Sequence, residues 1–80
     1  MSQSFTKTLA KCVYFHRKQS GLSREALAEL AGVGKALIYN IEHGKETIQL
    51  KTLLMVLDTL NIQLELKGPL MKAFEESIDA

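Results

Sequence analysis

The chain has 80 residues, of which 46% are hydrophobic and 24% are charged, a composition typical of one small soluble domain. No apolar run reaches the roughly 18 to 20 residues of a membrane span, and the N-terminus lacks a secretory signal pattern, so we expect a cytoplasmic protein without a membrane partner. Cys12 is the single cysteine, which excludes an internal disulfide and a zinc-binding cysteine set. A chain of this size buries only about 60% of its unfolded surface, so a second subunit would help to stabilise it.

The net charge of +1 averages over an uneven distribution. Residues 1–24 contain five basic residues and no acid, whereas residues 25–80 contain five lysines and nine acids. Such asymmetry indicates either an anion-binding face, as in nucleic-acid binding, or a basic helix that is merely solvated.

The first part of the chain predicts two helices. Residues 6–19 contain no glycine or proline and place Leu9, Val13 and Arg17 at helical spacing. Gly21 is suited to a left-handed C-cap, and Ser23 to capping the start of a second helix over residues 24–31. That second helix should face inward through Leu27, Ala28 and Ala31.

Two further helices are expected after the turn Gly32-Val33-Gly34. Residues 35–43 restart a helical pattern that Gly44 ends, and residues 50–60 form the next helix, with Asn61 as its cap. The apolar stripe of this helix should carry most of the core through Leu50, Leu53, Leu54, Leu57 and Leu60.

Residues 62–67 change the period, because apolar and polar residues alternate strictly there. This pattern predicts a β-strand, and a lone strand needs a partner for its backbone groups. We expect it to pair with the same strand of a second copy, with Ile62, Leu64 and Leu66 at the dimer interface. The alternatives are a frayed tail and a strand that folds on an N-terminal segment.

Residues 68–80 form a C-terminal tail in which an apolar face could build a short helix, although terminal segments are often disordered. The side chains of this face are Leu70, Met71, Phe74 and Ile78.

Two short helices joined by a glycine-containing turn have the geometry of a helix-turn-helix. Ala28 lies where the two helices must approach, and Ile38 and Ile41 would pack the second of them against the core. The outer face of that second helix is then formed by Lys35, Ala36, Tyr39 and Asn40.

Residues 9–60 resemble the Xre or Cro/phage-repressor class of helix-turn-helix proteins. The resemblance rests on L-x-x-x-V-x-x-x-R from Leu9, G-L-S-R-E-A-L-A-E-L-A-G-V from Gly21 and I-Y-N-I-E-H-G-K from Ile38. It implies an all-α bundle of four or five helices, dimeric binding to a palindromic operator in double-stranded DNA, and transcriptional repression. The added strand is most similar to HipB-type antitoxins, which repress the operon of a kinase-like toxin. We therefore expect a helix-turn-helix domain over residues 1–67, including the dimerisation strand, followed by the tail.

The resemblance also implies roles for individual residues. The helix over residues 35–43 becomes the recognition helix, whose base-reading positions are Lys35, Ala36, Tyr39 and Asn40. Tyr39 could instead be a packing aromatic. The phosphate-side positions are Ser23, Arg24, Leu37, His43, Lys45 and Lys51.

This chain departs from the class at three positions. Arg24 replaces the usual glutamine and should strengthen a phosphate contact through its bidentate guanidinium. Gly34 replaces the usual polar N-cap, and Leu37 stands where a serine or threonine often bonds to phosphate.

Arg17 and Glu42 occupy positions that the class often joins in a buried ion pair, with a structural role. The rival interpretation has Arg17 on the surface, where it binds phosphate. His16 and His43 have no further ligand at metal-binding spacing, so we expect no metal site. No catalytic arrangement or cofactor motif is evident, so we expect neither an enzyme nor a cofactor.

The leading hypothesis is a homodimeric, sequence-specific repressor that is also the antitoxin of a HipA-type toxin-antitoxin operon. The alternative is a phage-type or restriction-modification control repressor without a toxin. A third hypothesis is a protein-interaction module that does not bind DNA.

Overall fold

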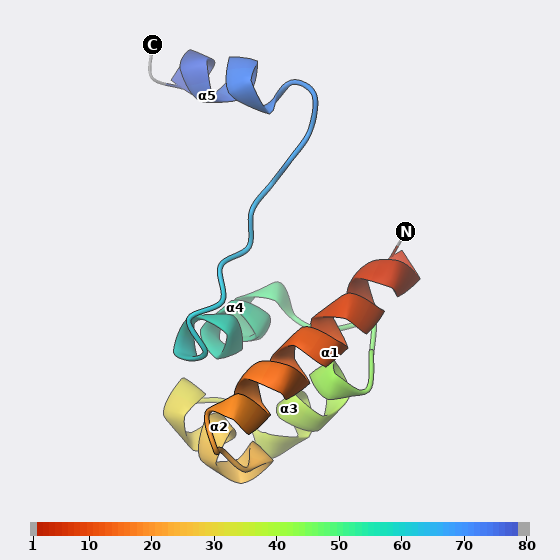
Figure 1. The fold of residues 1–80 in the computed structure, drawn as a ribbon, viewed down its shortest axis with the longest axis vertical. Coiled ribbons are helices and arrows are strands. Elements are labelled where there is room, and N and C mark those ends of the chain that lie inside the picture. The colour runs from red at the N-terminus through yellow and green to blue at the C-terminus, as the bar shows by residue number, and fades with distance from the viewer. Residues whose placement is uncertain (1, 79–80) are drawn as a thin grey trace.

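The computed structural model describes the backbone of residues 2–78, with side chains from residue 5 onward. Its helices are α1 (Ser2–Gln19), α2 (Arg24–Ala31), α3 (Lys35–Glu42), α4 (Leu50–Thr59) and α5 (Met71–Ile78). The first four pack as a bundle, and α5 lies apart from it at the end of an extended segment (Figure 1). The molecule therefore measures 44 × 25 × 22 Å. The described part of the chain is all-helical with five helices, as predicted apart from the strand.

Helix α1 begins at Ser2 rather than at residue 6, because residues 2–5 contain no helix breaker. Beyond the helix end, Gly21 has a φ of 71°, the left-handed conformation expected of a C-cap. Inside the bundle, α1 contributes Leu9 and Val13 to one apolar cluster. The other buried members are Leu27, Ala28, Ala31, Ile38, Ile41, Leu53, Val56, Leu57 and Leu60.

The residues that flank α2 and α3 determine where these two helices begin and end. Ser23 caps α2 by accepting a 3.0 Å hydrogen bond from the backbone N–H of Ala26. Gly32 ends α2 with a φ of 75°, which a side chain would strain. Gly34 begins α3 without a side-chain cap, so the first N–H groups of α3 have no side-chain acceptor at this position.

Helix α4 buries a narrower face than its leucine stripe predicted. Leu53, Val56 and Leu57 are buried, whereas Leu50 is 63% and Leu54 44% exposed. The stripe was wrong on these two leucines although Leu50 also lies three residues from Leu53, so packing against the rest of the bundle decides which side chains of α4 are buried. Leu50 and Leu54 lie beside that face.

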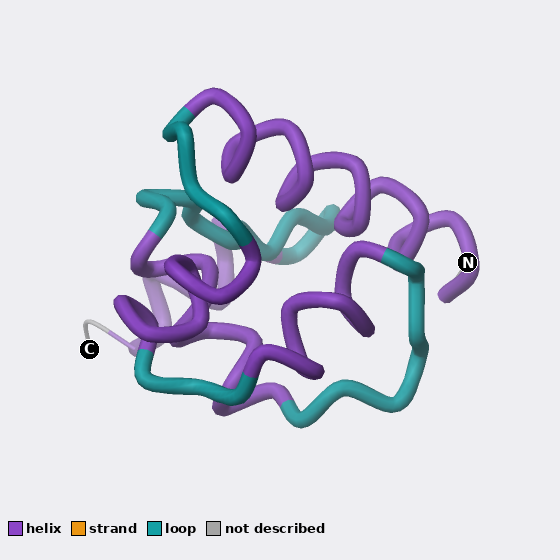
Figure 2. The backbone as a smooth tube through the Cα atoms, turned by 90° about the horizontal axis from the view of Figure 1, so that it is seen from below, coloured by secondary structure: helices purple, strands orange, loops and turns teal. Residues whose placement is uncertain are grey.

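The predicted strand over residues 62–67 is absent. Figure 2 shows loop throughout this segment, and no strand occurs anywhere in residues 2–78. The physical reason is that a strand exists only as part of a hydrogen-bonded ladder, and this chain offers the segment no second strand. Ile62 is tied to the bundle through a 2.8 Å hydrogen bond from its N–H to the Leu57 carbonyl and through packing on the core.

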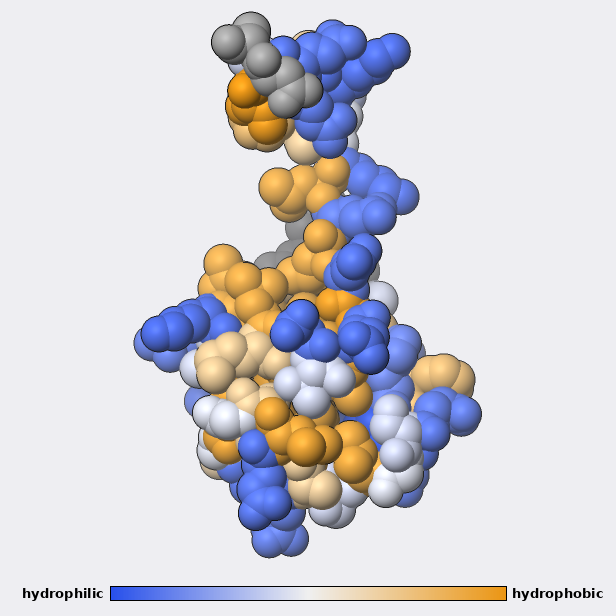
Figure 3. Space-filling model, turned by 90° about the vertical axis from the view of Figure 1, so that its left-hand side faces the viewer, coloured by the Kyte–Doolittle hydropathy of each residue, from blue (hydrophilic) through white to orange (hydrophobic). Residues whose placement is uncertain are grey.

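The extended segment and α5 together form the arm, residues 62–78. Leu66, Phe74 and Ile78 of the arm are 82%, 53% and 65% exposed. Figure 3 shows apolar side chains along one side of the arm and hydrophilic ones along the other. The predicted C-terminal helix is present, and none of its described residues is buried. Among the described helices, none combines the length and hydropathy needed to span a membrane.

The buried and exposed faces of α2 give a matched test of the core. Leu27 is fully buried and Leu30 is 66% exposed on the same helix. Leu27→Ala should lower the free energy of unfolding by about 2–5 kcal/mol, because it opens a cavity. Leu30→Ala should change it by about 0.5 kcal/mol or less. Urea denaturation followed by circular dichroism measures both, and equal losses would contradict this packing of α2.

Candidate nucleic-acid interface

One face of α3 packs on the core and the opposite face is open to solvent. Ile38 and Ile41 are 0% and 1% exposed, which fixes the inner face. On the outer face the Lys35 side chain is 62% exposed and Tyr39 is 50% exposed. Ala36 is also exposed and Asn40 is half-buried, so the four predicted base-reading residues share this outer face.

A buried carboxylate, that of Glu42, lies behind this face. The Glu42 side chain is only 1% exposed, and Arg17 of α1 binds both of its oxygens. The distances are 2.6 Å from Arg17 Nε to Oε2 and 3.1 Å from Nη2 to Oε1. Arg24 of α2 donates from Nε to Oε1 at 3.0 Å. Glu42 thereby joins α3 to both α1 and α2.

Arg17 is fully engaged in this cluster. Its Nη1 donates to the Leu22 carbonyl at 2.8 Å, and its side chain is 7% exposed. The hydrogen bond to Glu42 raises the pKa of Arg17 above its ordinary value, against the opposing effect of burial. A raised pKa stabilises the fold at every pH below the ordinary arginine range, so this contribution does not vary at neutral pH. The structure brings Arg17 and Glu42 together inside the protein and leaves Arg17 no surface for phosphate.

Three side chains form a stack at the edge of the outer face. The rings of Tyr39 and His43 lie 3.7 Å apart at 19°, and the Arg24 guanidinium carbon is 5.5 Å from the Tyr39 centroid. His43 Nδ1 is 2.7 Å from the Tyr39 carbonyl oxygen. Arg24 Nε is bound to Glu42, but its two Nη nitrogens have no hydrogen-bond partner among the described residues. The four-residue spacing of Tyr39 and His43 in the sequence is a signal that could have predicted this stack.

Glu25 is a charged neighbour of the outer face that sequence reasoning missed. Its Oε1 lies 3.9 Å from Lys35 Nζ, and the two side chains are 75% and 62% exposed. No sequence pattern relates these positions, because the pair joins the start of α2 to the start of α3. A pair this exposed contributes little stability.

The remaining predicted phosphate-side residues are spread over several elements. Ser23 is exposed at the start of α2, Lys45 lies in the loop after α3, and Lys51 is in the first turn of α4. Leu37 packs against the core cluster and carries no hydrogen-bond donor in its side chain.

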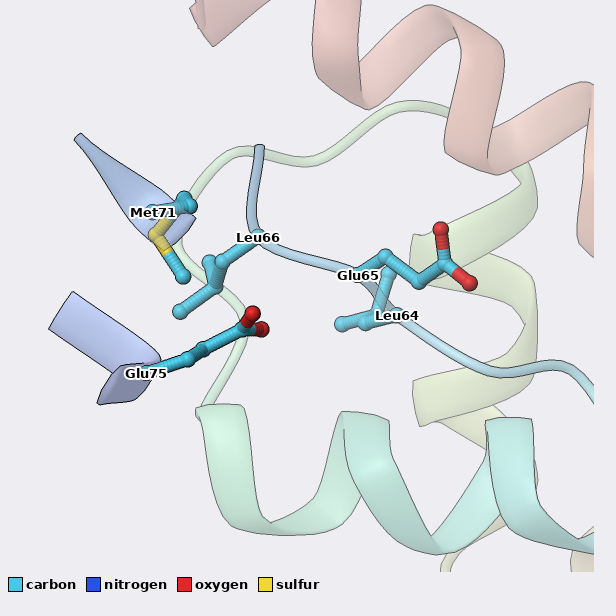
Figure 4. Close-up of a pocket in the computed structure, with 5 residues that line it drawn as sticks. All are labelled: Leu64, Glu65, Leu66, Met71 and Glu75. Atoms are coloured by element: carbon cyan, nitrogen blue, oxygen red, sulfur yellow. The ribbon is translucent and has the colours of Figure 1, made fainter. Parts of the chain in front are cut away.

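The predicted dimer residues lie away from this face, on the arm. Leu64 and Leu66 join Met71 and Glu75 around an open hollow of about 560 Å³ (Figure 4). Glu65 also lines the hollow. Within residues 2–78 no group of three His, Cys, Asp or Glu side chains could hold a metal ion.

The family profile described as helix-turn-helix (HTH_3) matches residues 15–67, and the chain belongs to this family. An uncharacterised HTH-type transcriptional regulator, y4mF of Sinorhizobium fredii (strain NBRC 101917 / NGR234), is 40% identical over 53 residues, which cover 66% of this chain and 70% of the relative.

Solved structures agree with this family. The MDT protein and a chain of the HipA-HipB-O2-O3 complex each align with a TM-score of 0.71 and 26% identity, over 80% of this chain and 90% of theirs. An HTH_3 family transcriptional regulator from Vibrio cholerae aligns with a TM-score of 0.69 and 32% identity, over 79% of this chain and 35% of that one.

A double-mutant cycle tests the buried cluster. Arg17→Ala should lower the free energy of unfolding by about 3–5 kcal/mol, because it leaves the Glu42 charge buried with only Arg24. The Arg17→Ala/Glu42→Ala protein should lose less than the sum of the single losses, by about 2–3 kcal/mol. The exposed pair of Lys35 and Glu25 serves as the control, with a coupling below about 1 kcal/mol. Additive losses at Arg17 and Glu42 would show that the cluster does not couple the helices.

Proposed function

We propose that this protein is a homodimeric, sequence-specific DNA-binding repressor. The observation that carries the proposal is the solvent-exposed outer face of α3, held from behind by the buried Glu42 cluster. A recognition helix must keep a fixed orientation to read base edges, and two arginine contacts to one carboxylate supply that constraint.

The chemistry of the outer face suits the major groove. Lys35 offers an ammonium group to guanine O6 and N7, and Asn40 can bond to adenine N6 and N7. The Ala36 methyl can contact a thymine methyl. Tyr39 lies one turn further on, where its stack with His43 favours a fixed aromatic surface next to the bases.

Phosphate contacts would orient the protein on the duplex. The free Nη nitrogens of Arg24 can donate to one phosphate while Nε stays on Glu42. The Ser23 oxygen accepts the capping hydrogen bond from Ala26, so the Ser23 hydroxyl hydrogen can still be donated to a phosphate. Lys45 and Lys51 add positive charge, and Leu37 could contribute only apolar contact.

Exposed groups on the arm support the proposal that the protein is a dimer. Its extended segment presents backbone groups without a ladder, and Leu64 and Leu66 are exposed on it. Pairing of two copies around a two-fold axis would supply the missing ladder and cover these leucines together with Ile62. Two recognition helices would then read half-sites about one helical turn apart, roughly 34 Å, in a palindromic operator.

We further propose that the repressor is the antitoxin of a HipA-type toxin-antitoxin operon, which it autoregulates. Support comes from the similarity to a chain of the HipA-HipB-O2-O3 complex and from the uncovered apolar face of α5. A phage-type or restriction-modification control repressor is the alternative. A neighbouring gene that encodes a kinase-like protein, and co-purification of that protein with this one, would support the antitoxin. Absence of both would support the control repressor.

DNA binding is tested with a gel shift against the upstream region of the chain's own gene. Each of Lys35→Ala and Asn40→Ala should weaken specific binding by about 1–3 kcal/mol, because each removes a base contact. Lys45→Ala should weaken binding to all sequences and lower the salt slope by about one.

Lys72→Ala is the matched control, since Lys72 is exposed on α5, far from α3. No preference for the upstream region over competitor DNA would contradict the proposed function, and would favour a protein-interaction module that does not bind DNA.

The dimer is tested by sedimentation. Leu64→Glu places a charge on the proposed pairing face and should shift the protein to monomer. Gln63→Glu adds the same charge to the opposite side of the segment, because side chains alternate along extended backbone, and should leave the dimer intact. If both variants sediment like the unmodified dimer, the arm is not the interface.

A further inference from the structure

We propose that His43 binds a DNA phosphate as an imidazolium that keeps its hydrogen bond to the Tyr39 carbonyl and its stack on the Tyr39 ring, so that DNA affinity rises as the pH falls below neutrality. The inference rests on the proposed function and adds to it the protonation state in which one contact forms.

The hydrogen bond to Tyr39 determines what His43 can do. A carbonyl oxygen only accepts, so the Nδ1 atom 2.7 Å from the Tyr39 oxygen carries the hydrogen. In the neutral ring Nε2 then has a lone pair and no hydrogen. A phosphate oxygen also only accepts, so neutral His43 cannot donate to it while Nδ1 keeps its bond to the Tyr39 carbonyl. The imidazolium carries hydrogen on both nitrogens and can satisfy the Tyr39 carbonyl and a phosphate together.

The position of the ring suits a ligand on the outer face of α3. His43 follows Tyr39 by four residues and Ala36 by seven, so the three lie on one side of the helix. His43 is exposed, and its ring is held parallel to Tyr39 at 3.7 Å. Both the stack and the Tyr39 carbonyl fix the ring, which lowers the entropy that a phosphate contact would otherwise cost.

The charges around His43 suit a phosphate. Arg24 of α2 lies over the same Tyr39 ring, and Lys45 follows two residues later in the loop. Lys35 lies two turns earlier on the same face, where its Nζ is 3.9 Å from Glu25 Oε1. The carboxylate of Glu42 is occupied by Arg17 and Arg24, and Glu46 is exposed in the loop. A phosphate bound at His43 would therefore meet the cations of Arg24 and Lys45 together with an imidazolium.

The chain contains a matched control in its second histidine. His16 Nδ1 lies 2.7 Å from the Cys12 carbonyl oxygen, the same bond to the residue four positions earlier. His16 is on α1, away from the outer face of α3, and its ring meets Phe15 edge-on rather than stacking on a parallel ring. Any general effect of titrating a histidine bonded in this way should therefore appear at His16 as well.

The test measures DNA affinity at pH 6 and pH 8 with two probes, the upstream region and a duplex of arbitrary sequence at low salt. The unmodified protein should bind both about tenfold more tightly at pH 6, the size of one charge-assisted hydrogen bond. The salt slope should be larger by about one at pH 6, since one more phosphate is neutralised. His43→Gln should remove the pH dependence on both probes, and His16→Gln should retain it.

An affinity that is independent of pH, or a pH dependence that survives in His43→Gln, overturns the inference and leaves the proposed repressor intact. A pH dependence lost in His16→Gln also overturns it. Binding without preference for the upstream region overturns the proposed function, while the arbitrary duplex still tests the phosphate contact. Absence of binding to either probe at both pH values overturns both.

Discussion

The carboxylate of Glu42 is removed from solvent almost completely, and the arrangement of the first three helices depends on how its charge is compensated. A buried unpaired carboxylate would cost several kcal/mol, so Arg17 and Arg24 must approach it from α1 and α2. Their fixed planar geometry then sets how α3 lies against its neighbours. Apolar packing through Ile38 and Ile41 would allow small rotations of α3, whereas three directed hydrogen bonds to one carboxylate restrict them.

The same cluster connects the interior with the outer face. Arg24 is bonded to Glu42 through Nε and lies over the ring of Tyr39, which in turn stacks on His43. A group that holds α3 from behind is therefore in contact with side chains of its outer face. The arm differs from the bundle, because it extends away from it with apolar side chains exposed along one side.

Much of the bundle was predictable, because its boundaries are local. Ser23 caps α2 through an atom three residues away, and Gly32 ends it through its own backbone conformation. The helix-turn-helix spacing also follows from local periodicity, and the family comparison agrees with it. Residues 62–67 form no strand within one chain, because alternation indicates extended backbone but cannot supply a pairing partner.

The sequence by itself determined the helices, the turn between α2 and α3, and the two sides of the arm, since these depend on neighbours within about one helical turn. Only the tertiary structure decided which leucines of α4 are buried, because Leu54 and Leu57 both belong to the predicted apolar stripe and the bundle buries only Leu57. The same holds for the second arginine on Glu42 and for the pairing of Glu25 with Lys35. Such contacts join residues far apart in the chain, and no local pattern encodes the distance between them.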